Sequence, residues 1–140
     1  MTPPEACPTL RAVRVTIHDE TAAGRVVGAL ELDVSGPVRL RELIRLRVRE
    51  EVARYNARPV ERFHGLVRPT AAETDLNGYL MPVPARIDWE QQADAAVTAF
   101  GRNAFFVLVG DRQVEDLDEE LTLDEASRVA FIRLVQLVGG

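Results

Sequence analysis

Hydrophobic and polar residues alternate over two stretches near the start of the chain. Val13, Val15 and Ile17 are separated by polar residues, and a second alternating run lies between residues 30 and 34. Alternation with a period of two is typical of strands that bury one face. Small and polar residues at 19–24 separate the two runs, so the pattern predicts a β-hairpin.

The hydrophobic period changes after the Ser-Gly-Pro segment at 35–37, whose composition suits a junction between a strand and a helix. From residue 40 onward, apolar residues recur at spacings of three and four, with arginines on the other faces. This period predicts an amphipathic helix of about five turns. Its apolar positions are Leu40, Leu43, Ile44, Val48, Val52 and Tyr55.

Neither period persists from residue 57 to residue 84, a segment that contains four prolines. We expect a long loop here, with a short hairpin at 76–80, where an Asn-Gly pair signals a turn. Loops of this length in a compact domain are uncommon and often functional. A second helix follows, because Asp88 is a favourable N-cap, Gln91 stands three residues later and Gly101 suits the helix end.

The C-terminal part of the chain predicts further strands. The apolar run at 104–109 is typical of a strand buried on both faces in the middle of a sheet. Eight acidic residues then fall between 111 and 125, which predicts a solvated loop or a docking face, and their spacing is not that of a calcium loop. Residues 127–140 predict a last strand that runs to the end of the chain. The expected order is β-β-α, an insertion with a helix, β, a short strand or turn, and β.

This order of elements resembles the ubiquitin-like β-grasp. The segment 107–140, "VLVGDRQVEDLDEELTLDEASRVAFIRLVQLVGG", is similar to the C-terminal half of the sulfur-carrier proteins of molybdopterin and thiamine synthesis, which also end on Gly-Gly. The resemblance implies one α+β domain over residues 1–140. Residues 57–104 would then be an insertion with no counterpart in the small carriers, and residues 137–140 a flexible tail. The matching residues are Val107 to Val109, Gly110, Gln113, Leu121, Val129, Ala130, Phe131, Ile132, Gly139 and Gly140.

The resemblance also implies a chemistry for the end of the chain. In this superfamily an E1-like adenylating enzyme uses ATP to activate the terminal carboxylate, which makes its carbonyl electrophilic toward a thiol, a sulfide or an amine. Gly140 would carry that carboxylate, and Gly139 would help to thread a narrow channel because glycine has no Cβ. An E2-like enzyme and a tail-processing protease are further partners that the resemblance allows. The apolar segment expected to hold the tail on its partner comprises Arg133, Leu134, Val135, Gln136, Leu137 and Val138.

The composition of the chain argues against several classes of partner and site. The net charge of −5 and the lack of a basic stripe argue against a nucleic-acid partner. We expect a cytoplasmic protein without a membrane partner, because the chain has no signal-peptide pattern and no apolar run long enough to span a bilayer. A single cysteine, Cys7, cannot form an internal disulfide. The sequence predicts no bound cofactor and no metal site, and ATP would be used by the activating enzyme.

Three functional readings remain from the sequence. All seventeen basic residues are arginines, which either reflects a GC-rich genome or prevents a protein modifier from being joined to its own lysines. This absence favours a modifier, whereas the last strand favours a sulfur carrier that forms a C-terminal thiocarboxylate. A non-conjugating β-grasp interaction module is the third reading. We expect no enzymatic activity of the chain itself, since His18 and His64 are accompanied by no nucleophile or phosphate-loop motif.

Overall fold

The computed structural model describes residues 12–57, 62–63, 65–69, 72–75, 78–80 and 86–134, and these form an α+β structure with two helices and a mixed five-stranded sheet. The chain divides into two compact units, one from residues 1–42 and 103–140 and the other from residues 43–102. The first unit holds the five-stranded sheet. The second holds most of helix α1 and all of helix α2.

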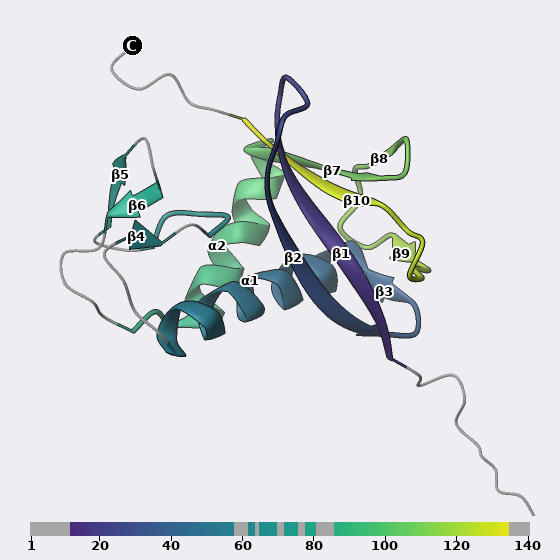
Figure 1. The fold of residues 1–140 in the computed structure, drawn as a ribbon, viewed down its shortest axis with the longest axis horizontal. Coiled ribbons are helices and arrows are strands. Elements are labelled where there is room, and N and C mark those ends of the chain that lie inside the picture. The colour runs from purple at the N-terminus through teal and green to yellow at the C-terminus, as the bar shows by residue number, and fades with distance from the viewer. Residues whose placement is uncertain are drawn as a thin grey trace, which may run out of the picture. The chain divides into compact units, whose positions relative to one another are not determined.

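The sheet of the first unit has the order β2-β1-β10-β7-β8, and Figure 1 shows β10 between β1 and β7. Strand β10 runs parallel to β1, while every other neighbouring pair is antiparallel. The first and last strands of the described chain are therefore direct neighbours. The bounds are β1 Ala12–Thr21, β2 Val26–Ser35, β7 Phe105–Val109, β8 Arg112–Val114 and β10 Val129–Arg133.

The predicted N-terminal hairpin is confirmed as β1 and β2. Both alternating runs bury one face, with Val15 and Ile17 fully buried on β1. Ile17 faces Leu30 of β2 on one side and Val129 of β10 on the other. The hairpin turn contains Gly24 at a φ of +87°, a backbone conformation that favours glycine. Strand β2 begins at Val26, four residues before the alternation that the sequence displays.

The central strand of the sheet is β10, and the prediction that 104–109 is buried on both faces is wrong. On β7, Phe105 and Val107 are buried, whereas Phe106 and Leu108 remain partly exposed on the opposite face. An apolar run on a strand with one partly exposed face reads in sequence like a strand covered on both faces. The last strand also ends sooner than expected, at Arg133.

The acidic segment caps the first turn of helix α1 (Leu40–Ala57). The N–H groups of Leu40 and Arg41 donate to the carbonyls of Glu119 (3.0 Å) and Leu117 (2.9 Å). These bonds satisfy two of the four donors that a helix start leaves unpaired. The short strand β3 (Val38–Arg39) pairs beside this junction with β9 (Glu120–Leu121). The acidic segment is thus a docked structural element of the first unit.

Within the second unit, both predicted helices and the short hairpin are confirmed. Helix α2 spans Trp89–Gly101. Strands β5 (Glu73–Asp75) and β6 (Gly78–Leu80) form this hairpin, and Gly78 of the Asn-Gly signal is the first residue of β6, paired with Asp75. Strand β4 (Arg62–Phe63), which the sequence did not indicate, pairs with the other side of β6.

Polar side chains of the two helices hold backbone segments of the inserted region. Asn56 on α1 bonds both backbone groups of Ile87, donating to its carbonyl at 2.9 Å and accepting from its N–H at 2.8 Å. A buried Gln92 side chain on α2 donates to the carbonyl of Val67. Glu51 accepts from the N–H of Leu66 at 3.3 Å. These bonds take the place of a regular sheet in fixing the loop, because irregular backbone near a core still needs partners.

The start of α2 is capped as predicted, but its end is not. Asp88 caps the start as predicted, since its Oδ1 accepts from the N–H of Glu90 at 3.0 Å and of Gln91 at 3.4 Å. Gly101 does not supply the left-handed turn after the helix. The last helical residue is Gly101, and the positive φ of 61° belongs to Asn103. Asparagine is the non-glycine residue that adopts this conformation most readily.

Candidate functional site

The structure describes the root of the proposed tail. Arg133 ends strand β10 and faces Thr21 of β1 and Phe105 of β7. Leu134 follows it, 41% exposed, and its N–H donates to the carbonyl of Ala104 over a long 3.5 Å. The remaining predicted tail residues, Val135, Gln136, Leu137, Val138, Gly139 and Gly140, lie outside the described residues.

Several strand ends meet where the tail begins. Because β1 and β10 are parallel, they reach this end of the sheet together, and β2 and β7 both start here. The exposed large hydrophobic residues of the described chain all belong to this end: Val26 (48%), Val27 (54%) and Leu134. We call these three residues the root surface. Exposed apolar side chains at one end of a sheet offer contact area to a partner.

The two valines of the root surface were not identified from the sequence. They lie where the β1–β2 register shifts: Val26 pairs with Glu20 and Gly28 with Asp19, so Val27 is the extra residue. A bulge places an extra residue on one strand and breaks the alternation. The only local signal is the pair of β-branched residues itself, which lies between the predicted turn at 19–24 and the alternating run at 30–34.

An ion pair crosses the outer face of the sheet beside the root. The Arg128 guanidinium lies 3.2 Å from the Glu20 carboxylate, whose side chain is only 12% exposed. His18 lies two residues before Glu20, and its Nδ1 is buried without a hydrogen-bond partner among the described residues. No hydrogen bond therefore joins His18 Nδ1 to an acid or a nucleophile among the described residues. The other histidine, His64, lies outside the described residues.

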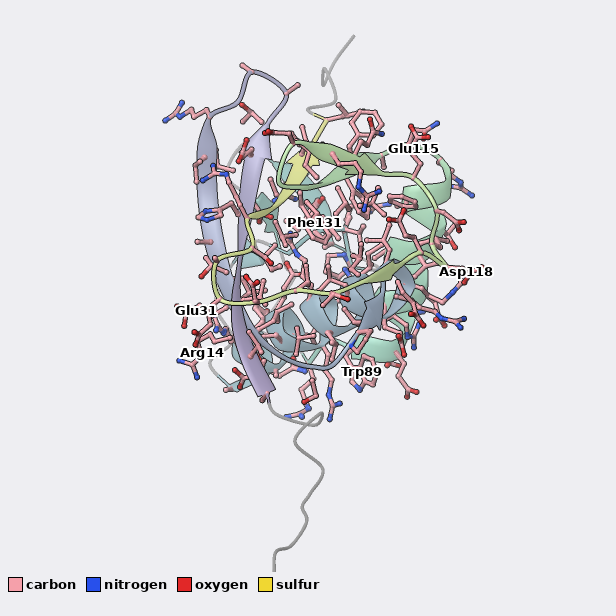
Figure 2. All side chains as sticks on the ribbon, turned by 90° about the vertical axis from the view of Figure 1, so that its right-hand side faces the viewer. Arg14, Glu31, Trp89, Glu115, Asp118 and Phe131 are labelled. Carbon is pink, nitrogen blue, oxygen red and sulfur yellow. The ribbon has the colours of Figure 1, made fainter. Side chains whose placement is uncertain are left out.

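The acidic segment offers no metal site in the described part of the chain, where no group of three His, Cys, Asp or Glu side chains could hold an ion. Its carboxylates instead pair with arginines of the same unit. Asp118 lies 3.2 Å from Arg41, and Glu119 pairs with Arg112. The hydrogen bond and charge of Glu119 raise the pKa of Arg112. Figure 2 shows Asp118 and Glu115 at the edge of the molecule, where Glu115 is exposed.

Two arginines of α1 lie over the ring of Trp89, at the start of α2. The guanidinium carbons of Arg45 and Arg49 lie 5.7 and 5.4 Å from the ring centroid, within the range of cation–π attraction. Arg45 also pairs with Asp94 at 2.6 Å. These contacts join α1 to α2 inside the second unit and account for the half-buried tryptophan, labelled in Figure 2, as a structural contact.

Comparison of the chain with protein-family models, with curated proteins and with solved structures finds no match. Neither described helix is long and apolar enough to cross a membrane.

Proposed function

We propose that this chain is a ubiquitin-like modifier or carrier with a β-grasp fold. Its Gly140 carboxylate is adenylated by an E1-like enzyme and then transferred to a protein. The observation that carries the proposal is the position of the last strand. A mixed sheet in which the final strand lies in the centre, parallel to the first strand of an N-terminal hairpin, is the arrangement expected of a β-grasp.

The sheet position also suits the chemistry. Strand β10 is paired on both sides, with β1 and with β7, up to Arg133. A doubly paired strand holds the root of a tail in one place, so that a partner can guide the residues beyond it into an active site. The root surface provides apolar contact area where such a partner would grip.

The proposed activation and conjugation proceed in three steps. The Gly140 carboxylate oxygen attacks the α-phosphorus of ATP, and pyrophosphate leaves, so an acyl-adenylate forms. A thiolate of the activating enzyme then attacks the acyl carbon, and AMP leaves with the bonding electrons. An amine of a target protein would complete conjugation by displacing the thiolate.

The sulfur-carrier alternative shares the first step. It is favoured by the similarity of residues 107–140 to the carriers. It differs in the second step, in which a donor of sulfide-level sulfur attacks the acyl carbon and AMP leaves, so that a thiocarboxylate forms. The third alternative, an interaction module that reacts with nothing, is favoured by the exposed valines of the root surface.

The test combines intact mass with activation. The mass of the protein isolated from its own cells first establishes whether Gly140 carries the free carboxylate. The purified protein is then incubated with ATP and each adenylating enzyme of the same genome. We expect an adenylate or an enzyme thioester, and a variant with one alanine added after Gly140 serves as the matched control because it leaves every described residue unchanged.

The product of the reaction distinguishes the sulfur carrier from the protein modifier. A thiocarboxylate formed with a sulfur donor identifies the carrier, and an amide with a target protein identifies the modifier. If neither the native chain nor the extended control reacts with any candidate enzyme, the proposal is refuted in favour of the interaction module.

A further inference from the structure

On the basis of the function proposed above, we propose that the enzyme that activates Gly140 holds the root surface with an apolar patch bordered by carboxylates. Arg25 is the residue of this chain that meets those carboxylates. It directly precedes Val26 of the root surface, at the end of the sheet where the tail begins.

The backbone of Arg25 is fixed beside the tail root. Its N–H donates to Thr21 Oγ1 at 3.2 Å, and its carbonyl accepts from the N–H of Thr21 at 2.9 Å. Thr21 in turn faces Arg133, the last residue of β10. Figure 1 shows the turn between β1 and β2 at the same end of the sheet as the yellow end of β10. Arg25 therefore lies close to the point where the tail leaves the sheet.

The charge of Arg25 is not balanced within the described part of the chain. Arg25 is exposed, and no described carboxylate forms an ion pair with it. The acids at the same end of β1 do not offset it at the surface, because Glu20 is only 12% exposed and holds Arg128, and Asp19 is partly buried. Four other arginines of the first unit do pair with carboxylates: Arg14, Arg41, Arg112 and Arg128.

The opposite end of the first unit has the opposite charge. Strand β7 ends and β10 begins there, since Val109 pairs with Val129, and eight acidic residues lie between 111 and 125 in the chain that joins these strands. A basic partner would be drawn to that end, away from the tail. An acidic partner is repelled from it and attracted to Arg25, so the charges orient the encounter with the root first.

The apolar part of the contact is made by side chains. Val26 and Val27 are about half exposed, and Leu134 is 41% exposed. The register shift makes Val27 an extra residue on β2, and a bulge of this kind disturbs the strand edge and discourages the addition of another strand. The partner is therefore expected to cover these three side chains with apolar ones, and to place its carboxylates around them.

Arg39 is the matched control for Arg25. It too is exposed and forms no ion pair with a described residue, and its N–H also donates to a side chain, that of Glu42, at 2.9 Å. Arg39 lies at the acidic end, however, where it pairs with Glu120 of β9. Arg25→Glu and Arg39→Glu lower the net charge of −5 by the same amount, so only the position of the change differs.

The test measures the initial rate of ATP–pyrophosphate exchange with the adenylating enzyme found by the intact-mass experiment. We expect Arg25→Glu to lower kcat/KM for the chain about 5- to 10-fold at an ionic strength of about 0.05 M. The loss should shrink to about twofold at about 0.5 M, because salt screens exposed charges. The kcat at saturating chain should stay unchanged, since Arg25 acts on the encounter and not on the carboxylate.

The controls separate position from net charge and from folding. Arg39→Glu should stay within about twofold of the native kcat/KM at both ionic strengths. Arg25→Gln removes the charge without adding one, so its loss should be about half that of Arg25→Glu on a logarithmic scale, and it replaces Arg25→Glu where urea unfolding shows that this variant does not fold.

Three results overturn the acidic partner. Equal losses for Arg25→Glu and Arg39→Glu would show that net charge matters and position does not, and a faster reaction of Arg25→Glu would show that the enzyme surface is basic. In both cases Gly140 is still activated, so the proposed function stands. If no enzyme activates the native chain, the proposed function and this partner are refuted together.

Discussion

Truncation of Phe131 to alanine tests whether β10 forms the centre of the sheet. Phe131 is fully buried, and its ring stacks on that of Phe105 with a centroid distance of 5.7 Å. Removing a buried phenylalanine side chain lowers the free energy of unfolding by about 3–5 kcal/mol, from lost burial and the cavity left behind. The neighbouring residue, Ile132, points to the opposite face and is partly exposed, so Ile132→Ala should cost about 1 kcal/mol.

The two variants form a matched pair, because both shorten an apolar residue at adjacent positions of one strand. Urea unfolding followed by far-UV circular dichroism would measure both midpoints and slopes. A domain of this size has a total stability of about 5–15 kcal/mol, so Phe131→Leu serves where Phe131→Ala does not fold. The fluorescence of Trp89, the single tryptophan, reports the second unit in the same experiment.

The test depends on the difference between the losses of unfolding free energy caused by Phe131→Ala and by Ile132→Ala. If Ile132→Ala destabilises the protein as much as Phe131→Ala, then β10 does not present Phe131 to a buried face, and the proposed position of the last strand is wrong. If the midpoints from circular dichroism and Trp89 fluorescence coincide, the two units unfold together.

The remaining predictions concern helix ends and the inserted region, each measured by the same urea unfolding. Asp88→Ala should cost about 1 kcal/mol through loss of the N-cap, and Asp88→Asn or Asp88→Ser should recover most of it. Asn56→Ala should cost about 2–3 kcal/mol, because it removes two bonds and leaves both backbone groups of the buried Ile87 unpaired. Asn103→Gly should change stability by less than about 0.5 kcal/mol, whereas Asn103→Val should cost about 1–2 kcal/mol because its φ is positive.

Each of these predictions has a result that contradicts it. Equal stability of Asp88→Ala and the native chain would mean that another group caps α2. A loss below about 0.5 kcal/mol for Asn56→Ala, as for the exposed control Arg54→Ala, would mean that the Ile87 segment is held by other contacts. If Asn103→Val were as stable as the native chain, residue 103 would not need the left-handed conformation that follows α2.

Local periodicity was sufficient to predict the long elements. Both helices and the hairpins carry their signal in neighbouring residues, namely the spacing of apolar positions on α1, Asp88 before α2 and the Asn-Gly pair at the start of β6. Each such signal acts within a few residues of the structure that it specifies.

The short strands and the sheet order could not be predicted in this way. Strands β3 and β9 have two residues each, too few to show a period, and they exist because residues 38 and 121 meet across the first unit. The apolar run of β7 misled for a related reason. Phe106 and Leu108 lie on the partly exposed face of β7, and an unbroken apolar run does not show in sequence which face the fold covers.

The same distinction between local signals and strand pairing applies to the candidate site. The sequence directed attention to Arg133 and Leu134, whose positions at the end of β10 fit the expected root of a tail. It gave no sign of Val26 and Val27, because their exposure depends on the register shift with β1 and on the open edge of β2. Both properties arise from pairing between strands rather than from the residues themselves.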